Sequence, residues 1–227
     1  WPILLLASAL RLFRIGERDF WYDEAFTGNL IRNDWTTMMK DIAYDIHPPL
    51  HYILLKGFAF VFGDGVTSLR LFSAICGIAS VGLVYLIAKE LKNKQAGLYA
   101  SFIAAIAPFA IQYSQETRMY ALYGLLVLVS VHCFLQALRT NRYLWWMGWG
   151  ISLALACLAH YMALLFIGCF AVAWLIANVD AKKMWRGSLR ERLPALKALL
   201  PSRGLVGGSI IGLLVFLPWK ANFIRQL

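Results

Sequence analysis

Long apolar runs separated by short polar segments dominate this chain. The runs cover residues 1–15, 66–88, 96–111, 120–138, 143–159, 162–177 and 204–219. A helix needs about 20 predominantly apolar residues to cross the hydrocarbon core of a bilayer, and these runs approach that length. The pattern therefore predicts an all-α fold, a polytopic membrane helix bundle of about seven spans.

Residues 17–64 break this pattern, because they mix polar and apolar positions. The stretch DWTTMMKDIAYD predicts a short helix with Asp34 as its N-cap. The stretch PPLHYILLKGFAFVFG predicts a second helix that begins at a proline pair and ends at Gly63. This second helix can either cross the membrane or lie along its surface, and the choice reverses the side on which every later loop lies.

The distribution of charge decides between the two topologies. If the second helix lies on the surface, the cations in 89–94, 139–142 and 182–203 all face the cytoplasm, as the positive-inside rule requires. Eight of the twelve acidic residues lie in 17–64, which is then an external loop carrying two juxtamembrane helices. The basic segment 182–203 is expected to form an amphipathic helix on the anionic inner leaflet.

The composition supports a membrane protein and argues against a nucleic-acid partner. Hydrophobic residues make up 60% of the chain and charged residues 15%, whereas a soluble domain is about half apolar and a quarter charged. A net charge of +10 would suggest nucleic-acid binding in a soluble protein. Here the cations flank apolar runs rather than line a polar groove, so we expect no nucleic-acid partner.

Three polar clusters lie on the external side under this topology, although ionisable residues are costly at membrane depth unless they face a cavity. The first is in the acidic loop, the second is the turn between two spans, and the third follows the run that ends at residue 159. Their candidate residues are Asp23, Glu24 and His47, then Tyr113, Gln115, Glu116, Arg118 and Tyr120, then His160 and Tyr161.

Each cluster also has a purely structural interpretation. The acidic pair can cap the helix that follows it. His47, which precedes two prolines, can be a turn residue, Glu116 and Arg118 can form a local ion pair, and His160 can serve only packing.

The chemical interpretation is more specific. A carboxylate at the mouth of a membrane cavity can act as a general base on an acceptor hydroxyl. The guanidinium of Arg118 matches the geometry of a phosphate leaving group, and aromatic rings nearby can stack on a sugar. Glu24 and His47 can hold a divalent metal ion, although their spacing matches no specific metal signature.

The ordered set FWYDEAFTGN, HPPLHYILLKGFAFVFG, SLRLFSAICGIASVGLVYLIAKEL, APFAIQYSQETRMYAL and LAHYMALL resembles the GT-C superfamily of membrane glycosyltransferases. Within it, the chain is most similar to the bacterial branch related to protein O-mannosyltransferases and lipid A aminoarabinose transferases. The resemblance implies a hexosyl- or pentosyltransferase that moves a sugar from a polyprenyl-phosphate donor to a protein, lipid or glycan acceptor, with inversion. It also implies a bacterial inner-membrane protein whose site faces the periplasm or exterior.

The resemblance assigns roles to the candidate residues. Asp23 would be the catalytic base with Glu24 as its catalytic neighbour, and His47 would fall where relatives place a metal-associated residue. Glu116 and Arg118 would lead the donor-phosphate pocket, while His160 and Tyr161 would complete the cavity wall.

Residues 1–227 are then expected to be the N-terminal transmembrane catalytic domain of a GT-C-like glycosyltransferase, a fragment that lacks the C-terminal part of that protein. The alternative is a transporter or flippase of polyprenyl-linked glycans, which would favour inverted repeats and polar groups at mid-membrane. Neither feature is visible in the sequence.

Overall fold

The computed structural model describes residues 1–178 and 202–226, and these residues form helices and no strand. The helices are α1 (Pro2–Leu12), α2 (Tyr22–Arg32), α3 (Trp35–Tyr44), α4 (Leu50–Phe62), α5 (Val66–Leu91), α6 (Lys94–Ile106), α7 (Pro108–Ser114), α8 (Tyr120–Thr140), α9 (Tyr143–Ala159), η1 (Tyr161–Ala163), α10 (Leu164–Asn178), α13 (Arg203–Phe216), η2 (Leu217–Trp219) and α14 (Lys220–Gln226). The all-α prediction is therefore confirmed. The amphipathic helix expected over 182–203 lies outside the described residues, except for its last two positions.

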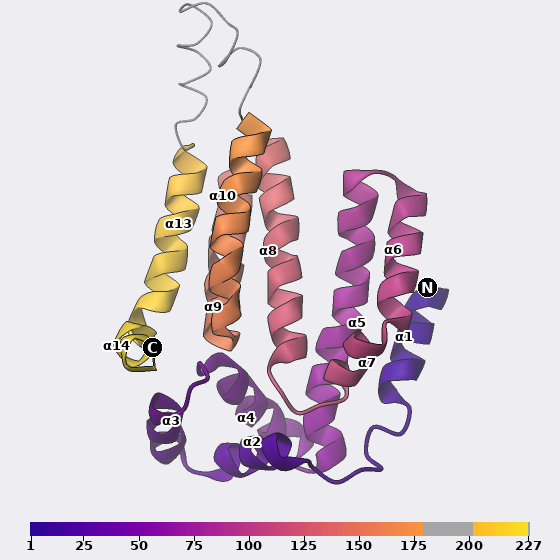
Figure 1. Ribbon diagram of the computed structural model, residues 1–227, viewed down its shortest axis with the longest axis vertical. Helices are drawn as coiled ribbons and strands as arrows, with labels where there is room; N and C mark the ends of the chain where they lie inside the picture. Colours follow the sequence, from indigo (N-terminus) through magenta and orange to yellow (C-terminus); the bar gives the residue numbers. More distant parts are fainter. Residues whose placement is uncertain (179–201, 227) are drawn as a thin grey trace, which may run out of the picture.

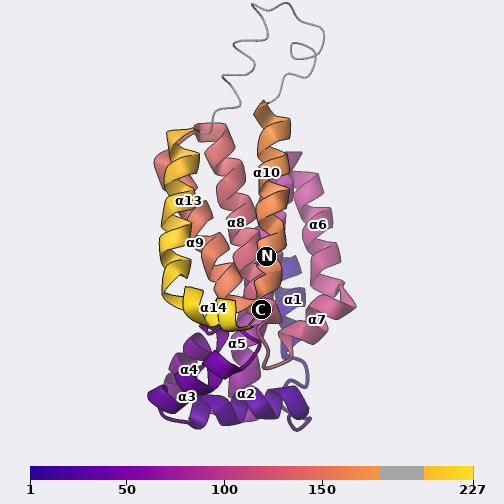
Figure 2. The same cartoon turned by 60° about the vertical axis from the view of Figure 1, so that its left-hand side comes forward.

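The long helices run side by side, and a layer of three short helices closes one end of the bundle (Figure 1). α2, α3 and α4 make this layer, and Figure 2 shows it lying across the same end from a second direction. The turn before α8, the end of α9 and the C-terminal α14 all meet the layer. The three polar clusters therefore share one end of the molecule, as the charge pattern predicted.

Among the residues that the structure describes, four helical segments are long and apolar enough to cross a membrane: Val66–Leu91, Tyr120–Thr140, Tyr161–Asn178 and Arg203–Gln226. A fifth crossing arises if α6 and α7 are counted together, although they are bent by 61°. α1, α4 and α9 are shorter apolar helices. The chain is thus a membrane helix bundle, while the expected count of about seven spans stays a prediction.

The bend between α6 and α7 corrects the continuous run expected over 96–111. Ala107 has extended backbone (φ −61°, ψ 118°), and Pro108 begins the next helix. Proline disfavours helical geometry in the residue before it and offers no N–H to the carbonyl four residues back. The span is therefore broken close to the end of the bundle where the polar clusters lie.

The three-helix layer has a core of its own, and its predicted boundaries are confirmed. Asp34 caps α3 by accepting hydrogen bonds from two backbone N–H groups, and Gly63 ends α4 with φ +85°. The buried residues of this core are Leu30, Ile31, Met38, Ile42, Tyr52, Leu55, Leu69 and Trp219. Because Leu69 and Trp219 come from α5 and η2, the core anchors the layer to the bundle.

Glycines bring α9 and α13 into close contact. A Cβ at Gly208 would lie 2.3 Å from the carbonyl oxygen of Trp146, and one at Gly150 would lie 1.9 Å from that of Gly208. Small residues at such positions let membrane helices pack backbone against backbone.

Substituting alanine at Gly208 is expected to destabilise the protein by about 1–3 kcal/mol, because the added methyl group forces two backbones apart. The matched control is Gly168→Ala on α10, where an added Cβ meets nothing within 4 Å. Thermal unfolding in detergent checks this, and an equal loss in both variants would contradict the packing argument.

Candidate active site

Asp23 presents a half-open carboxylate at the end of the bundle. It lies in the first turn of α2, and its side chain is 35% exposed. One carboxylate oxygen (Oδ2) is 3.8 Å from Nη2 of Arg118. This distance is longer than that of a tight ion pair. The carboxylate therefore has a cation nearby but is still free to contact a ligand.

Arg118 reaches Asp23 from the turn between α7 and α8, although 95 positions separate the two residues. Its side chain is nearly buried. Nη1 donates to the backbone oxygen of Asp23 (3.4 Å) and to the hydroxyl of Thr27 (3.2 Å), while Nη2 lies 3.4 Å from Nε2 of His47. The guanidinium thus links α2 to the chain segment before α4.

His47 and His160 complete this side of the site. Nδ1 of His47 lies 3.1 Å from a carboxylate oxygen of Asp45, and the His47 and His160 rings are 6.4 Å apart. The rings of Tyr120 and Tyr123 lie 5.9 and 5.5 Å from His160. Burial, followed by the charges of His47 and Arg118, lowers the pKa of His160, which keeps the ring neutral at pH 7.

Aromatic rings extend from this cluster toward the outside. Tyr113 is exposed and packs on Tyr120 with ring centroids 4.8 Å apart. The structure therefore brings together six of the predicted residues, which are Asp23, Tyr113, Arg118, Tyr120, His47 and His160. Asp45 and Tyr123 were not predicted from the sequence, because an acidic residue in an acidic loop and a tyrosine within an apolar run carry no distinguishing signal.

Glu24 faces away from this cluster and is fully buried. Its two carboxylate oxygens accept from Nε (2.9 Å) and Nη2 (2.6 Å) of Arg70, and the N–H of Thr117 donates to the same carboxylate (2.7 Å). Burial alone would raise the pKa of Glu24, but the hydrogen bonds from Arg70 and Thr117 outweigh it and lower the pKa. Glu24 thus ties α2 to α5 and to the turn before α8, while its predicted part in catalysis stays a prediction.

Arg70 was not singled out in the sequence, although an isolated arginine in the apolar run of α5 is a signal for a buried partner. Besides Glu24, its guanidinium donates to the backbone oxygens of Ile15, Arg18 and Asp19. One side chain therefore fixes the segment between α1 and α2 as well as α2 itself.

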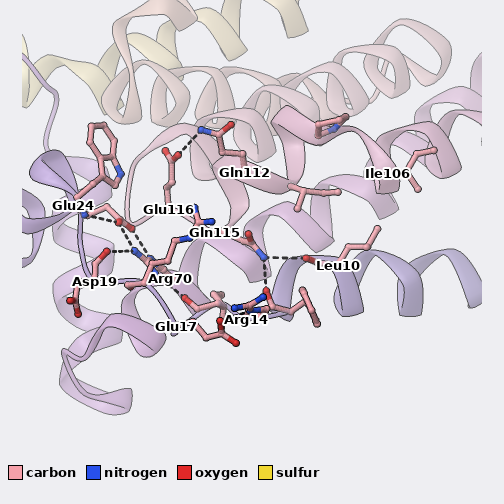
Figure 3. Close-up of a pocket in the computed structure, with 16 residues that line it drawn as sticks. Leu10, Arg14, Glu17, Asp19, Glu24, Arg70, Ile106, Gln112, Gln115 and Glu116 are labelled. Atoms are coloured by element: carbon pink, nitrogen blue, oxygen red, sulfur yellow. Dashed lines mark hydrogen bonds and ion pairs between the residues drawn. The ribbon is translucent and has the colours of Figure 1, made fainter.

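Three predicted residues do not meet Asp23 through any described contact. The amide of Gln115 donates to backbone oxygens at the end of α1. Glu116 accepts from Gln112 (3.0 Å) and lines a separate cavity of about 1250 Å³ (Figure 3). The hydroxyl of Tyr161 accepts from the indole N–H of Trp219 (2.9 Å), so Tyr161 packs toward the C-terminal helices.

The predicted metal pair does not fit a cation site in this arrangement. Both oxygens of Glu24 are held by Arg70, while the ring nitrogens of His47 face Asp45 and the positively charged Arg118. Within residues 1–178 and 202–226, no group of three His, Cys, Asp or Glu side chains is placed to hold a metal ion.

His51 is buried beneath the site with no described hydrogen-bond partner for either ring nitrogen. Burial, followed by the charge of Arg118, lowers its pKa to about 3. A histidine of ordinary pKa (about 6.5) in the unfolded chain binds a proton well before the folded one does. Stability contributed by neutral His51 is therefore lost as the pH falls from about 6.5 toward 3.

We expect His51→Phe to flatten this pH dependence. Between pH 7 and pH 4 the wild-type protein should lose on the order of 3 kcal/mol more unfolding free energy than the variant, because the phenylalanine has no proton to bind. Denaturant unfolding at both pH values measures the difference. Equal losses in the two proteins would show that His51 does not govern the acid response.

Comparison with known proteins identifies the family of the chain rather than the roles of single residues. The family described as dolichyl-phosphate-mannose-protein mannosyltransferase matches residues 46–220, a range that includes His47, Arg118 and His160 but begins after Asp23. The chain is 30% identical over 167 residues to the protein named "Putative mannosyltransferase YkcB" of Bacillus subtilis (strain 168), covering 72% of this chain and 23% of that protein. It is 27% identical over 156 residues to "Putative mannosyltransferase YycA" of the same strain, covering 67% of this chain and 22% of that protein. The chain thus spans about a quarter of the length of these curated relatives.

Proposed function

Because the chain belongs to the dolichyl-phosphate-mannose-protein mannosyltransferase family, we propose that it is the catalytic part of a membrane glycosyltransferase that draws its sugar from a polyprenyl-phosphate donor. The observation that carries the proposal is the half-open carboxylate of Asp23 beside the buried guanidinium of Arg118. A base and a cation side by side match a reaction in which a proton is removed and a phosphate leaves.

The proposed reaction is a direct displacement at the anomeric carbon. Asp23 takes the proton from the acceptor hydroxyl as the acceptor oxygen forms its bond to that carbon. The bond between the anomeric carbon and the donor phosphate oxygen breaks, and its electron pair leaves on the phosphate. Because the acceptor enters opposite the leaving group, the configuration at the anomeric carbon is inverted.

Arg118 has two roles in this scheme. Its buried guanidinium holds the backbone of Asp23 in place, and its charge stabilises the phosphate as negative charge develops there. A buried cation stabilises such charge more than the same cation would in solvent, because less water screens it.

The histidines and tyrosines shape the sugar side of the site. Nδ1 of His160 accepts from the N–H of Met162 (3.2 Å), so the neutral ring carries its proton on Nε2. That Nε2–H can donate a hydrogen bond to a sugar hydroxyl. Tyr113 and Tyr120 offer ring faces at the open edge. Glu116 would meet a substrate only from the separate cavity that it lines.

The setting of the reaction follows from the charge pattern. We propose that the three-helix layer faces the periplasm or exterior of a bacterial inner membrane and that the acceptor is a cell-envelope lipid, glycan or protein. The alternative, a transporter or flippase of polyprenyl-linked glycans, would favour polar groups at mid-membrane, whereas the three polar clusters share one end of the bundle.

The decisive experiment supplies labelled polyprenyl-phosphate mannose to proteoliposomes that contain the full-length protein and an envelope extract. Label in an acceptor supports the transferase. Label that crosses the bilayer while still attached to the polyprenyl carrier would support the transporter and contradict the proposal.

A further inference from the structure

A side chain of α1 caps the C-terminal end of α6, and a side chain that follows α7 caps the C-terminal end of α1. Arg11 of α1 is 1% exposed. Its guanidinium donates to the backbone oxygens of Ala105 (3.0 Å) and Ala104 (3.1 Å) at the end of α6. The residue that would ordinarily donate to Ala104 in a helix is the one four positions later, and that residue is Pro108, which has no N–H. Arg11 therefore satisfies a carbonyl that the break exposes.

The opposite contact comes from Gln115, just after α7. Its side-chain amide donates to the backbone oxygens of Leu10 (3.1 Å), Arg11 (3.3 Å) and Phe13 (3.0 Å). α1 ends at Leu12, so these are carbonyls at a helix end, where no further turn of helix supplies donors. Figure 3 shows Gln115 directed at the end of α1 near Leu10. Arg11 thus caps the C-terminal end of α6, and Gln115 caps the C-terminal end of α1.

We call Arg11 and Gln115, together with the carbonyl groups that they bind, the clasp. Gly77 of α5 leaves space for it. A Cβ at Gly77 would lie 2.0 Å from the hydroxyl oxygen of Ser114 and 3.1 Å from Nε of Arg11. Nε of Arg11 donates to that same hydroxyl (3.2 Å). The positive charge of Arg11 lies at the negative end of the α6 dipole, which stabilises it at depth.

The clasp lies immediately before the active-site turn. Gln115 is followed at once by the segment that carries Thr117, whose N–H holds Glu24, and Arg118, whose guanidinium touches Asp23. We propose that Arg11 and Gln115 are positioning residues that fix residues 114–118 against α1, and thereby hold Arg118 in register with Asp23. The effect on catalysis rests on the function proposed above, whereas the effect on the turn does not.

Amide hydrogen exchange tests the effect on the turn without any assumption about activity. Arg11→Met and Gln115→Met remove the donors at similar length, and exchange over residues 115–119 is expected to become about tenfold faster. The matched control is Gln136→Met on α8, because the Gln136 amide donates only to Glu90 within the described contacts and neither residue touches the segment 115–119. Arg11→Lys and Gln115→Lys retain a donor and should restore much of the protection.

Sugar transfer provides the second readout. In Gln115→Met we expect kcat to fall about tenfold with the donor KM within about twofold, because the clasp acts on the register of Arg118 rather than on binding. Faster exchange with no transfer even in the wild type would uphold the clasp and refute the proposed function. If Arg11→Met and Gln115→Met exchange over 115–119 no faster than Gln136→Met, the clasp is overturned, whatever the activity.

Discussion

Replacing Asp23 by asparagine is expected to lower sugar transfer by about 10²–10⁴-fold, because the amide cannot accept the proton of the acceptor hydroxyl. Asparagine has nearly the same shape, and the ion pair of Asp23 with Arg118 is long (3.8 Å), so the fold should tolerate the change. The measurement is the initial rate of labelled sugar transfer in membranes with matched protein levels.

The control for this variant is Asp41→Asn, an exposed carboxylate on α3 in the same acidic loop. It should retain the wild-type rate, since its described side-chain contact is a hydrogen bond from Asn33 (3.3 Å). A wild-type rate for Asp23→Asn would remove Asp23 from the mechanism. An equal loss in both variants would point instead to the net charge of the loop.

Breaking the Glu24–Arg70 pair is expected to destabilise the fold by about 3–5 kcal/mol, because either partner left alone is a buried charge without compensation. Glu24→Gln leaves the guanidinium uncompensated at its 2.6 Å contact, and Arg70→Met leaves the carboxylate uncompensated. The double variant should lose much less than the sum of the two single losses. Denaturant unfolding of the three variants measures these differences.

An exposed ion pair serves as the comparison for these single and double variants. Arg32 and Asp64 also lie 2.6 Å apart, but each side chain is about half exposed. Removing either of them should cost only about 0–1 kcal/mol. Additive losses at Glu24 and Arg70, or losses as small as those at the exposed pair, would contradict the role assigned to the buried pair.

The sequence predicted that the polar clusters lie at one end of the bundle, because the distribution of lysine and arginine among the loops indicates membrane topology. That rule placed Asp23, Arg118 and His160 on one side of the bundle. Local helix ends were predictable for a similar reason, since Asp34 and Gly63 act through their own backbone neighbours.

The sequence did not predict that Asp23 faces Arg118 while Glu24 is buried against Arg70. Adjacent residues on a helix point about 100° apart, so which carboxylate faces the site depends on what α2 packs against. Arg70 determines this, and it lies 46 positions away on another helix. The clasp was hidden for the same reason, because its contacts join residues about 90–105 positions apart.

The measurement that tests the central claim most directly is the anomeric configuration of the sugar in the product, read by nuclear magnetic resonance after transfer from a donor of known configuration. A direct displacement with Asp23 as general base predicts a product of opposite configuration to the donor. A product of retained configuration would contradict this mechanism, because a single displacement from the face opposite the leaving group cannot give it.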